Sequence, residues 1–162
     1  MKITHVVALM LVMFLAACSK DKKEIEPGLR LSIDGKEIIF SDFTVAEYDS
    51  TGGIHYLRVG GADQVLKPNM VGLGLTQEEP ITARPYIHPD PNNDFYVTLD
   101  FVPAGEDGTN PYLAGLDGTD PMSMTITSLT ATRVQGTFQG TLRRGTNDTK
   151  VISGGSFNLE LR

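Results

Sequence analysis

Histidines and nucleophiles are the residues whose spacing would reveal hydrolytic chemistry, and this chain offers few of them. Beyond residue 17 its histidines are His55 and His88, and neither lies near a Gly-x-Ser-x-Gly elbow or another nucleophile signature. Covalent hydrolysis needs a nucleophile, a base within hydrogen-bond reach and a group that orients the base. With 20 acidic residues some close carboxylate pair is inevitable, so such a pair does not indicate a glycosidase. We therefore predict no catalytic residue and a protein that is not an enzyme.

Two acidic stretches carry possible metal ligands. The first contains His88, Asp90 and Asp94, but intervening prolines stiffen it, and a zinc site needs three or four such ligands. The second, within 103–121, has side-chain oxygens that would suit calcium, from Glu106, Asp107, Asn110, Asp117 and Asp120. Its Asp-Gly and Asn-Pro pairs are equally typical of solvated turns. We predict no metal and no cofactor, and calcium binding in 103–121 stays open.

Two long loop regions, 77–93 and 103–121, are typical of binding surfaces carried on a rigid scaffold. Three tyrosines lie in or beside them and could form a modest aromatic platform, namely Tyr86, Tyr96 and Tyr112. Tyr96 is the most interesting because it falls on the polar face of a well-patterned strand. The chain has no tryptophan, which carbohydrate-binding platforms often use.

The elements that would position these loops are β-strands. Residues 29–41 alternate apolar and polar side chains around an Asp34-Gly35 turn, which predicts a β-hairpin. The same period of two recurs over 95–101, 122–127, 134–142 and 151–161, the last interrupted at Gly154-Gly155. Seventeen glycines and nine prolines, spread along the chain, are incompatible with long helices. We predict an all-β fold over 29–162, a single antiparallel β-sandwich or barrel of about eight to ten strands.

Residues 1–17 have the order of a secretory signal: Lys2, an apolar run from Val6 to Leu15, and small residues. The stretch Leu15-Ala16-Ala17-Cys18 resembles a bacterial lipobox. This resemblance implies cleavage before Cys18, the only cysteine, and attachment of lipid to it. Residues 18–28 are charged and close with Pro27-Gly28, so we predict a flexible tether. The expected location is the cell envelope, anchored in the outer membrane of a Gram-negative bacterium, with a periplasmic or surface orientation left open.

After residue 17 the chain has 13 basic and 20 acidic residues, a net charge of −7. A nucleic-acid partner is excluded on this basis, because binding phosphates requires a basic surface. Attachment to a membrane must then come from the lipid on Cys18 rather than from charge.

The C-terminal segments 136–142 (Gly-Thr-Phe-Gln-Gly-Thr-Leu) and 152–159 are similar to strands of small uncharacterised β-rich lipoproteins of Gram-negative bacteria. The second pattern is matched inexactly, because two glycines precede Ser156. This resemblance implies a β fold and an envelope location but no catalytic residue. The function we predict is a membrane-anchored, non-catalytic β-sandwich module that binds a protein or glycan partner. The alternatives are a small barrel carrying an apolar ligand, suggested by Met70, Met122 and Met124, or an envelope polysaccharide hydrolase.

Overall fold

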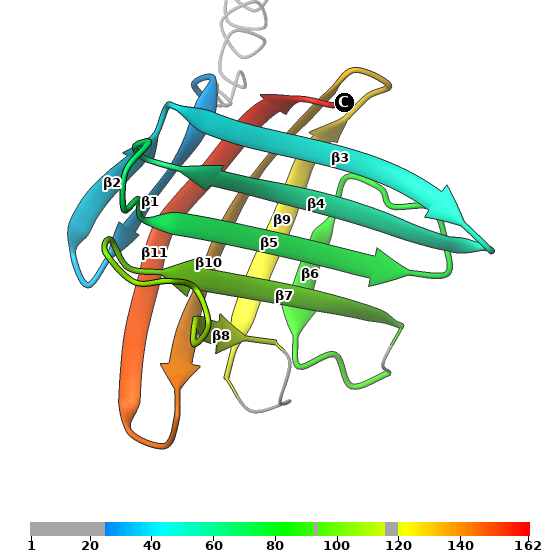
Figure 1. The fold of residues 1–162 in the computed structure, drawn as a ribbon. Coiled ribbons are helices and arrows are strands. Elements are labelled where there is room, and N and C mark those ends of the chain that lie inside the picture. The colour runs from blue at the N-terminus through cyan, green and yellow to red at the C-terminus, as the bar shows by residue number, and fades with distance from the viewer. Residues whose placement is uncertain (1–24, 93, 116–119) are drawn as a thin grey trace, which may run out of the picture.

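The computed structural model describes residues 25–92, 94–115 and 120–162, and Figure 1 shows that their regular elements are β-strands. The strands are β1 (Gly28–Ile33), β2 (Lys36–Phe40), β3 (Phe43–Thr51), β4 (Ile54–Ala62), β5 (Met70–Gln77), β6 (Pro85–His88), β7 (Phe95–Val102), β8 (Tyr112–Ala114), β9 (Met122–Leu129), β10 (Arg133–Arg144) and β11 (Asp148–Glu160). The prediction of an all-β fold is confirmed.

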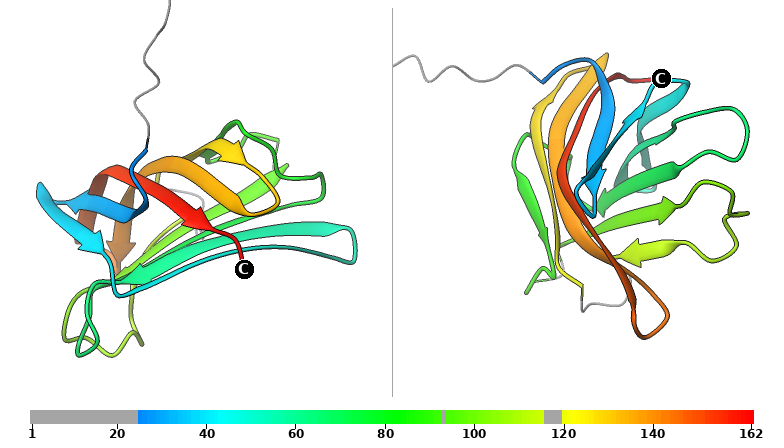
Figure 2. Two further views of the ribbon diagram at one scale, coloured as in Figure 1. Left: turned by 90° about the horizontal axis from the view of Figure 1, so that it is seen from above. Right: turned by 90° about the vertical axis from the view of Figure 1, so that its left-hand side faces the viewer.

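The strands pair antiparallel and form one sheet that curls into a nearly closed barrel (Figures 1 and 2). Its main path runs β2-β1-β11-β10-β8-β7-β5-β4-β3. Strand β10 belongs to two parts of the sheet, because Arg143 pairs with β8 whereas the stretch 134–140 pairs with β9, which in turn pairs with β6. The edge strand β3 meets the chain just after β11, where the backbone N–H of Arg162 donates to the carbonyl oxygen of Ala46 at 3.0 Å.

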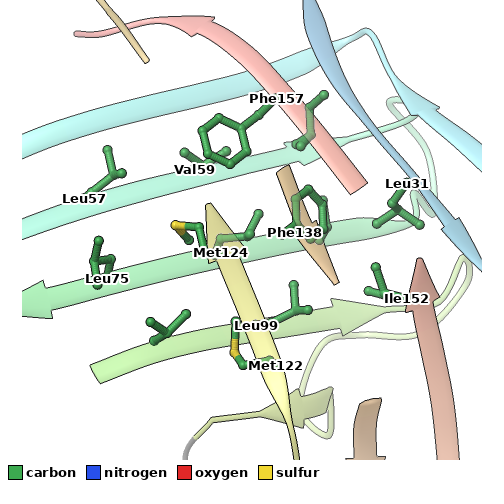
Figure 3. Close-up of a cluster of buried hydrophobic side chains, with 14 of the residues drawn as sticks. Leu31, Leu57, Val59, Leu75, Leu99, Met122, Met124, Phe138, Ile152 and Phe157 are labelled. Atoms are coloured by element: carbon green, nitrogen blue, oxygen red, sulfur yellow. The ribbon is translucent and has the colours of Figure 1, made fainter. Parts of the chain in front are cut away.

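The barrel interior is filled by side chains that alternate with outward-facing residues along each strand. On β5, Val71, Leu73 and Leu75 point inward and are at most 4% exposed, while the residues between them face outward. Figure 3 shows such side chains from facing strands meeting in the centre, among them Leu99, Met124 and Phe157. Burial of this apolar surface is the main force that holds the two sides of the barrel together.

Two hairpins are set by turn chemistry. Asp34 and Gly35, between β1 and β2, have φ values of 49° and 81°, so the hairpin predicted over 29–41 is present. Gly52 and Gly53 connect β3 to β4 with φ values of 64° and 82°. Positive φ at both central residues defines the two-residue turn whose twist matches that of the flanking strands.

The structure adds to the predicted strand pattern in two places. Short strands, β6 and β8, lie within the segments predicted as loops, which brings the number of strands to eleven. The interruption of the alternating pattern predicted at Gly154-Gly155 is present as a β-bulge, although β11 continues through it as one strand and Gly154 has a φ of 58°. The pairing of β11 with β10 shifts register between Phe138 and Gly140. This bulge turns Val151 outward, 53% exposed, and places Ile152 in the core.

The described chain begins beside the end of β11, where the side-chain amide of Asn158 donates to the carbonyl oxygen of Ile25 at 2.6 Å. The predicted signal, Cys18 and most of the predicted tether lie outside the described residues. Among the residues that are described, no helix has the length and apolar character needed to cross a membrane.

Candidate functional site

The two regions predicted to bind a partner lie at opposite ends of β7. Residues 78–84 and 89–92 lie near its start, on the right in Figure 1, whereas residues 103–111 follow its end, on the left. The regions approach each other at the beginning of β9, where His88 pairs with Met122. They therefore do not form one continuous loop surface, and each is considered separately.

The 103–111 segment is fixed to the β10–β11 hairpin by a network around Tyr112. The Tyr112 hydroxyl donates to Asp148 at 2.6 Å and accepts from Arg144 at 2.7 Å. The Arg144 guanidinium also pairs with Glu106 and lies over the Tyr112 ring at 4.1 Å from its centroid. The hydrogen bond to Asp148 raises the pKa of Tyr112, and the same bond lowers the pKa of Asp148. With its polar groups satisfied internally, this network is suited to holding the loop in place.

Carboxylates predicted as possible calcium ligands have other partners in the structure. Asp120 accepts two hydrogen bonds from Arg143, at 2.9 and 2.8 Å, which lower the pKa of this carboxyl. Asp107 accepts from the backbone and hydroxyl of Thr109, and these bonds lower its pKa. Asp117 lies outside the described residues. Across the described part of the chain, no three His, Cys, Asp or Glu side chains gather as a metal site would require.

Of the three tyrosines considered as an aromatic platform, one is available. Tyr86 and Tyr112 are 0% and 3% exposed, so the expectation that they present their rings to a ligand was wrong. The Tyr86 hydroxyl donates to the carbonyl oxygen of Thr82 and its ring meets Phe95 edge-on, which makes it a core residue. Tyr96 is 62% exposed and projects from the outer face of β7, as its position in the alternating pattern indicates.

Tyr96 borders an open pocket of about 600 Å³ at the end of the barrel where β5 finishes and β7 begins. Its lining also includes Ile54, Thr76 and Arg84. Three carboxylate residues, Glu78, Glu79 and Asp94, line the same pocket. An aromatic residue, an arginine and three carboxylate residues therefore line one solvent-accessible recess, which is more polar than most small-molecule pockets and offers both hydrogen-bond donors and acceptors.

The position of Arg84 in this recess is set by residues behind it. Its guanidinium lies 4.2 Å from the centroid of the Tyr86 ring and 5.3 Å from that of Phe95. Its Nη2 donates to the side-chain oxygen of Gln77 at 3.2 Å. Gln77 is 5% exposed, and its amide also donates to the carbonyl oxygens of Glu79 and Pro80. One buried amide thus fixes both the 78–84 loop and the arginine that the loop presents.

Arg84 forms no ion pair with any residue that the structure describes, although carboxylates line the same pocket. It is anchored through its stacking on aromatic rings and one neutral hydrogen bond. The remaining guanidinium donors are consequently free to meet a ligand.

Neither histidine lines this recess, although His55 pairs with Gln77 between β4 and β5. His55 stacks on Tyr48 with ring centroids 6.0 Å apart, and its Nδ1 forms a hydrogen bond with the Tyr48 hydroxyl at 2.9 Å. His88 borders a shallow pocket of about 410 Å³ on the outer face of β6, β9, β10 and β11. Its Nε2 is buried without a hydrogen-bond partner in the described residues.

Comparison with known proteins yields no relative, because no family model, no curated protein and no solved structure matches this chain. The similarity of its C-terminal strands to those of bacterial lipoproteins therefore stays a prediction. Lipid attachment to Cys18 also stays a prediction, since that residue is outside the described range.

Sequence reasoning selected the 77–93 region but missed Gln77 and Arg84 as the residues that organise it. The signal for Gln77 was present, because it continues the inward-facing series Val71, Leu73, Leu75 with a polar side chain. A polar residue at an apolar position of an alternating strand indicates a specific buried hydrogen bond. Arg84 had no comparable signal, since its partners come from three separate segments.

Proposed function

We propose that this protein is a membrane-anchored, non-catalytic binding module of the bacterial cell envelope, attached through lipid on Cys18. Its partner is a protein or a glycan. The observation that carries the binding role is the open recess in which Tyr96 is exposed beside an arginine held by buried groups. A side chain held in place before binding loses little entropy when the partner arrives.

The alternative of an apolar-ligand carrier has less support. Small barrels that carry ligands enclose a cavity, whereas the interior here is filled by side chains such as Met122, Met124 and Phe138 (Figure 3). A ligand inside the barrel would have to displace them. The hydrolase alternative lacks a nucleophile hydrogen-bonded to either histidine in the described residues.

The anchoring is tested by expressing the full chain and its Cys18→Ser variant in a Gram-negative host. We expect the parent protein in the membrane fraction, with an acylated N-terminal peptide that begins at Cys18. The variant should appear in the soluble periplasmic fraction. An unmodified Cys18 peptide in the parent protein would refute the anchor.

The orientation is tested by treating intact cells with protease beside a periplasmic control protein. Cleavage of this protein while the control survives would place the binding module on the cell surface. Protection of both until the outer membrane is opened would place it in the periplasm, where its partner would then be sought.

A further inference from the structure

We propose that the recess bordered by Tyr96 and Arg84 binds a neutral saccharide. This inference rests on the proposed function and assigns its ligand class.

The charges of the recess favour a ligand without net charge. Arg84 in its lining supplies positive hydrogen-bond donors, while Glu78, Glu79 and Asp94 supply negative acceptors. A polyanion would meet three carboxylates and a polycation would meet the guanidinium, so either would be opposed by part of the lining. Saccharide hydroxyl groups both donate and accept hydrogen bonds, so a neutral saccharide can use both kinds of group at once.

Aromatic rings on the outer face provide surfaces on which the apolar side of a sugar ring can stack. The register pairs Tyr56 on β4 with Thr76 on β5, and Thr76 with Tyr96 on β7. The two tyrosines therefore flank the smaller Thr76 on one face of the sheet, separated by two strand spacings, about 10 Å. This separation suits an oligosaccharide with one sugar unit near each ring.

The recess is also accessible to a long polymer. It lies at the right-hand end of β5 and β7 in Figure 1, whereas the described chain enters β1 at the upper left. Figure 2 shows the same separation from above. The first described residues therefore leave this end of the barrel uncovered, which keeps the recess open to a glycan chain.

The experiment uses the full-length protein extracted in a detergent without a sugar headgroup. The probes are neutral gluco-, manno- and xylo-oligosaccharides, compared with an oligogalacturonate as polyanion and a chitosan oligomer as polycation. Binding is measured by calorimetry and by affinity electrophoresis in gels that contain the parent polysaccharides. We expect at least one neutral probe to bind and the two charged probes to bind more weakly.

Three variants locate the site. Tyr96→Ala removes the exposed ring, and Arg84→Lys keeps the positive charge but loses the planar set of donors. Each should weaken binding of the neutral probe about tenfold or more, equivalent to about 1.4 kcal/mol. The matched control is Phe43→Ala, because Phe43 is 58% exposed, close to the 62% of Tyr96, but lies at the opposite end of the outer face. Circular dichroism checks that each variant is folded.

Unchanged affinity in both Tyr96→Ala and Arg84→Lys, or an equal loss in Phe43→Ala, would overturn the assignment of the site. Absence of binding to every neutral probe would overturn the ligand class. Binding of a charged probe or of a purified envelope protein that depends on Tyr96 would likewise overturn the saccharide inference, but it would leave the proposed binding module standing.

Discussion

Gln77 is expected to stabilise the recess, and replacing it tests the reasoning about how the site is built. The variant Gln77→Met keeps a side chain of similar length in the buried position but removes the three hydrogen bonds of the amide, two of them to the carbonyl oxygens of Glu79 and Pro80 and one from Arg84. Each such bond contributes about 1 kcal/mol to the free energy of unfolding. The three partner residues, Glu79, Pro80 and Arg84, are exposed, so their freed groups can bind water and we expect a net loss of about 1–2 kcal/mol rather than the full sum.

Urea unfolding followed by far-UV circular dichroism measures this change, since the chain contains no tryptophan. The corresponding fall in melting temperature is about 3–8 °C. Amide hydrogen exchange should accelerate over residues 78–84 and stay unchanged in β10 and β11. The control is Glu79→Ala, which keeps the carbonyl oxygen that Gln77 binds and should change stability by less than about 0.5 kcal/mol. An unchanged exchange rate over 78–84 in Gln77→Met would refute the role assigned to this amide.

Three further predictions concern the barrel itself. Gly115→Ala should destabilise the protein far more than Gly105→Ala. Both glycines have φ near +87°, so the backbone strain of an added methyl group is similar at the two positions. The methyl group at residue 115 would lie 1.9 Å from the carbonyl oxygen of Val97, whereas nothing lies within 4 Å of one at residue 105. Equal losses in urea unfolding would contradict this reading. Leu99→Ala should lower the free energy of unfolding by about 3–4 kcal/mol, because Leu99 is 0% exposed and the space it leaves is enclosed by the core. A loss below about 1 kcal/mol would mean that the core is loosely packed. Burial raises the pKa of Asp100, so the folded state holds this proton more tightly than the unfolded chain does. The fold therefore loses stability as the pH rises from the unfolded pKa to the higher folded pKa of this carboxyl, and the full loss is present above the folded pKa. Asp100→Asn should therefore be more stable than the parent at neutral pH. This advantage should shrink as the pH falls through the range in which the carboxyl group takes up its proton. A variant less stable than the parent at neutral pH would show that the charge has an unrecognised partner.

Alternation along the sequence predicted most of the barrel because each strand has one face in the core and one in water. The hairpin at Asp34-Gly35 and the strands around 95–101 and 122–127 follow directly from this rule. Strands β6 and β8 escaped it because they have only four and three residues, too few for a period of two to stand out from turn-rich surroundings. The choice of a barrel over a sandwich also depended on non-local pairing, in particular on β10 sharing its length between β9 and β8.

The candidate site was only partly predictable for a related reason. The outward position of Tyr96 follows from the strand pattern, and the structure confirms it. The burial of Tyr86 and Tyr112 does not follow, because it depends on partners far along the chain, such as Asp148 for Tyr112. Arg84 illustrates the same limit, since its place is set by Gln77 and Phe95, each more than six residues away in the sequence.

The position of β1 has a mechanical consequence for a protein held by its N-terminal side. Gly28, the first residue of β1, pairs with Asn158 of β11, and Leu29 pairs with both Phe157 and Phe40. With the anchor proposed on Cys18 and a ligand held at the other end of the barrel, tension would enter the sheet through β1. Because β1 is paired on both sides, with β11 and with β2, two ladders of hydrogen bonds would have to break before it left the sheet. Had the tether continued from an edge strand such as β3, the same force could have peeled the sheet apart rung by rung.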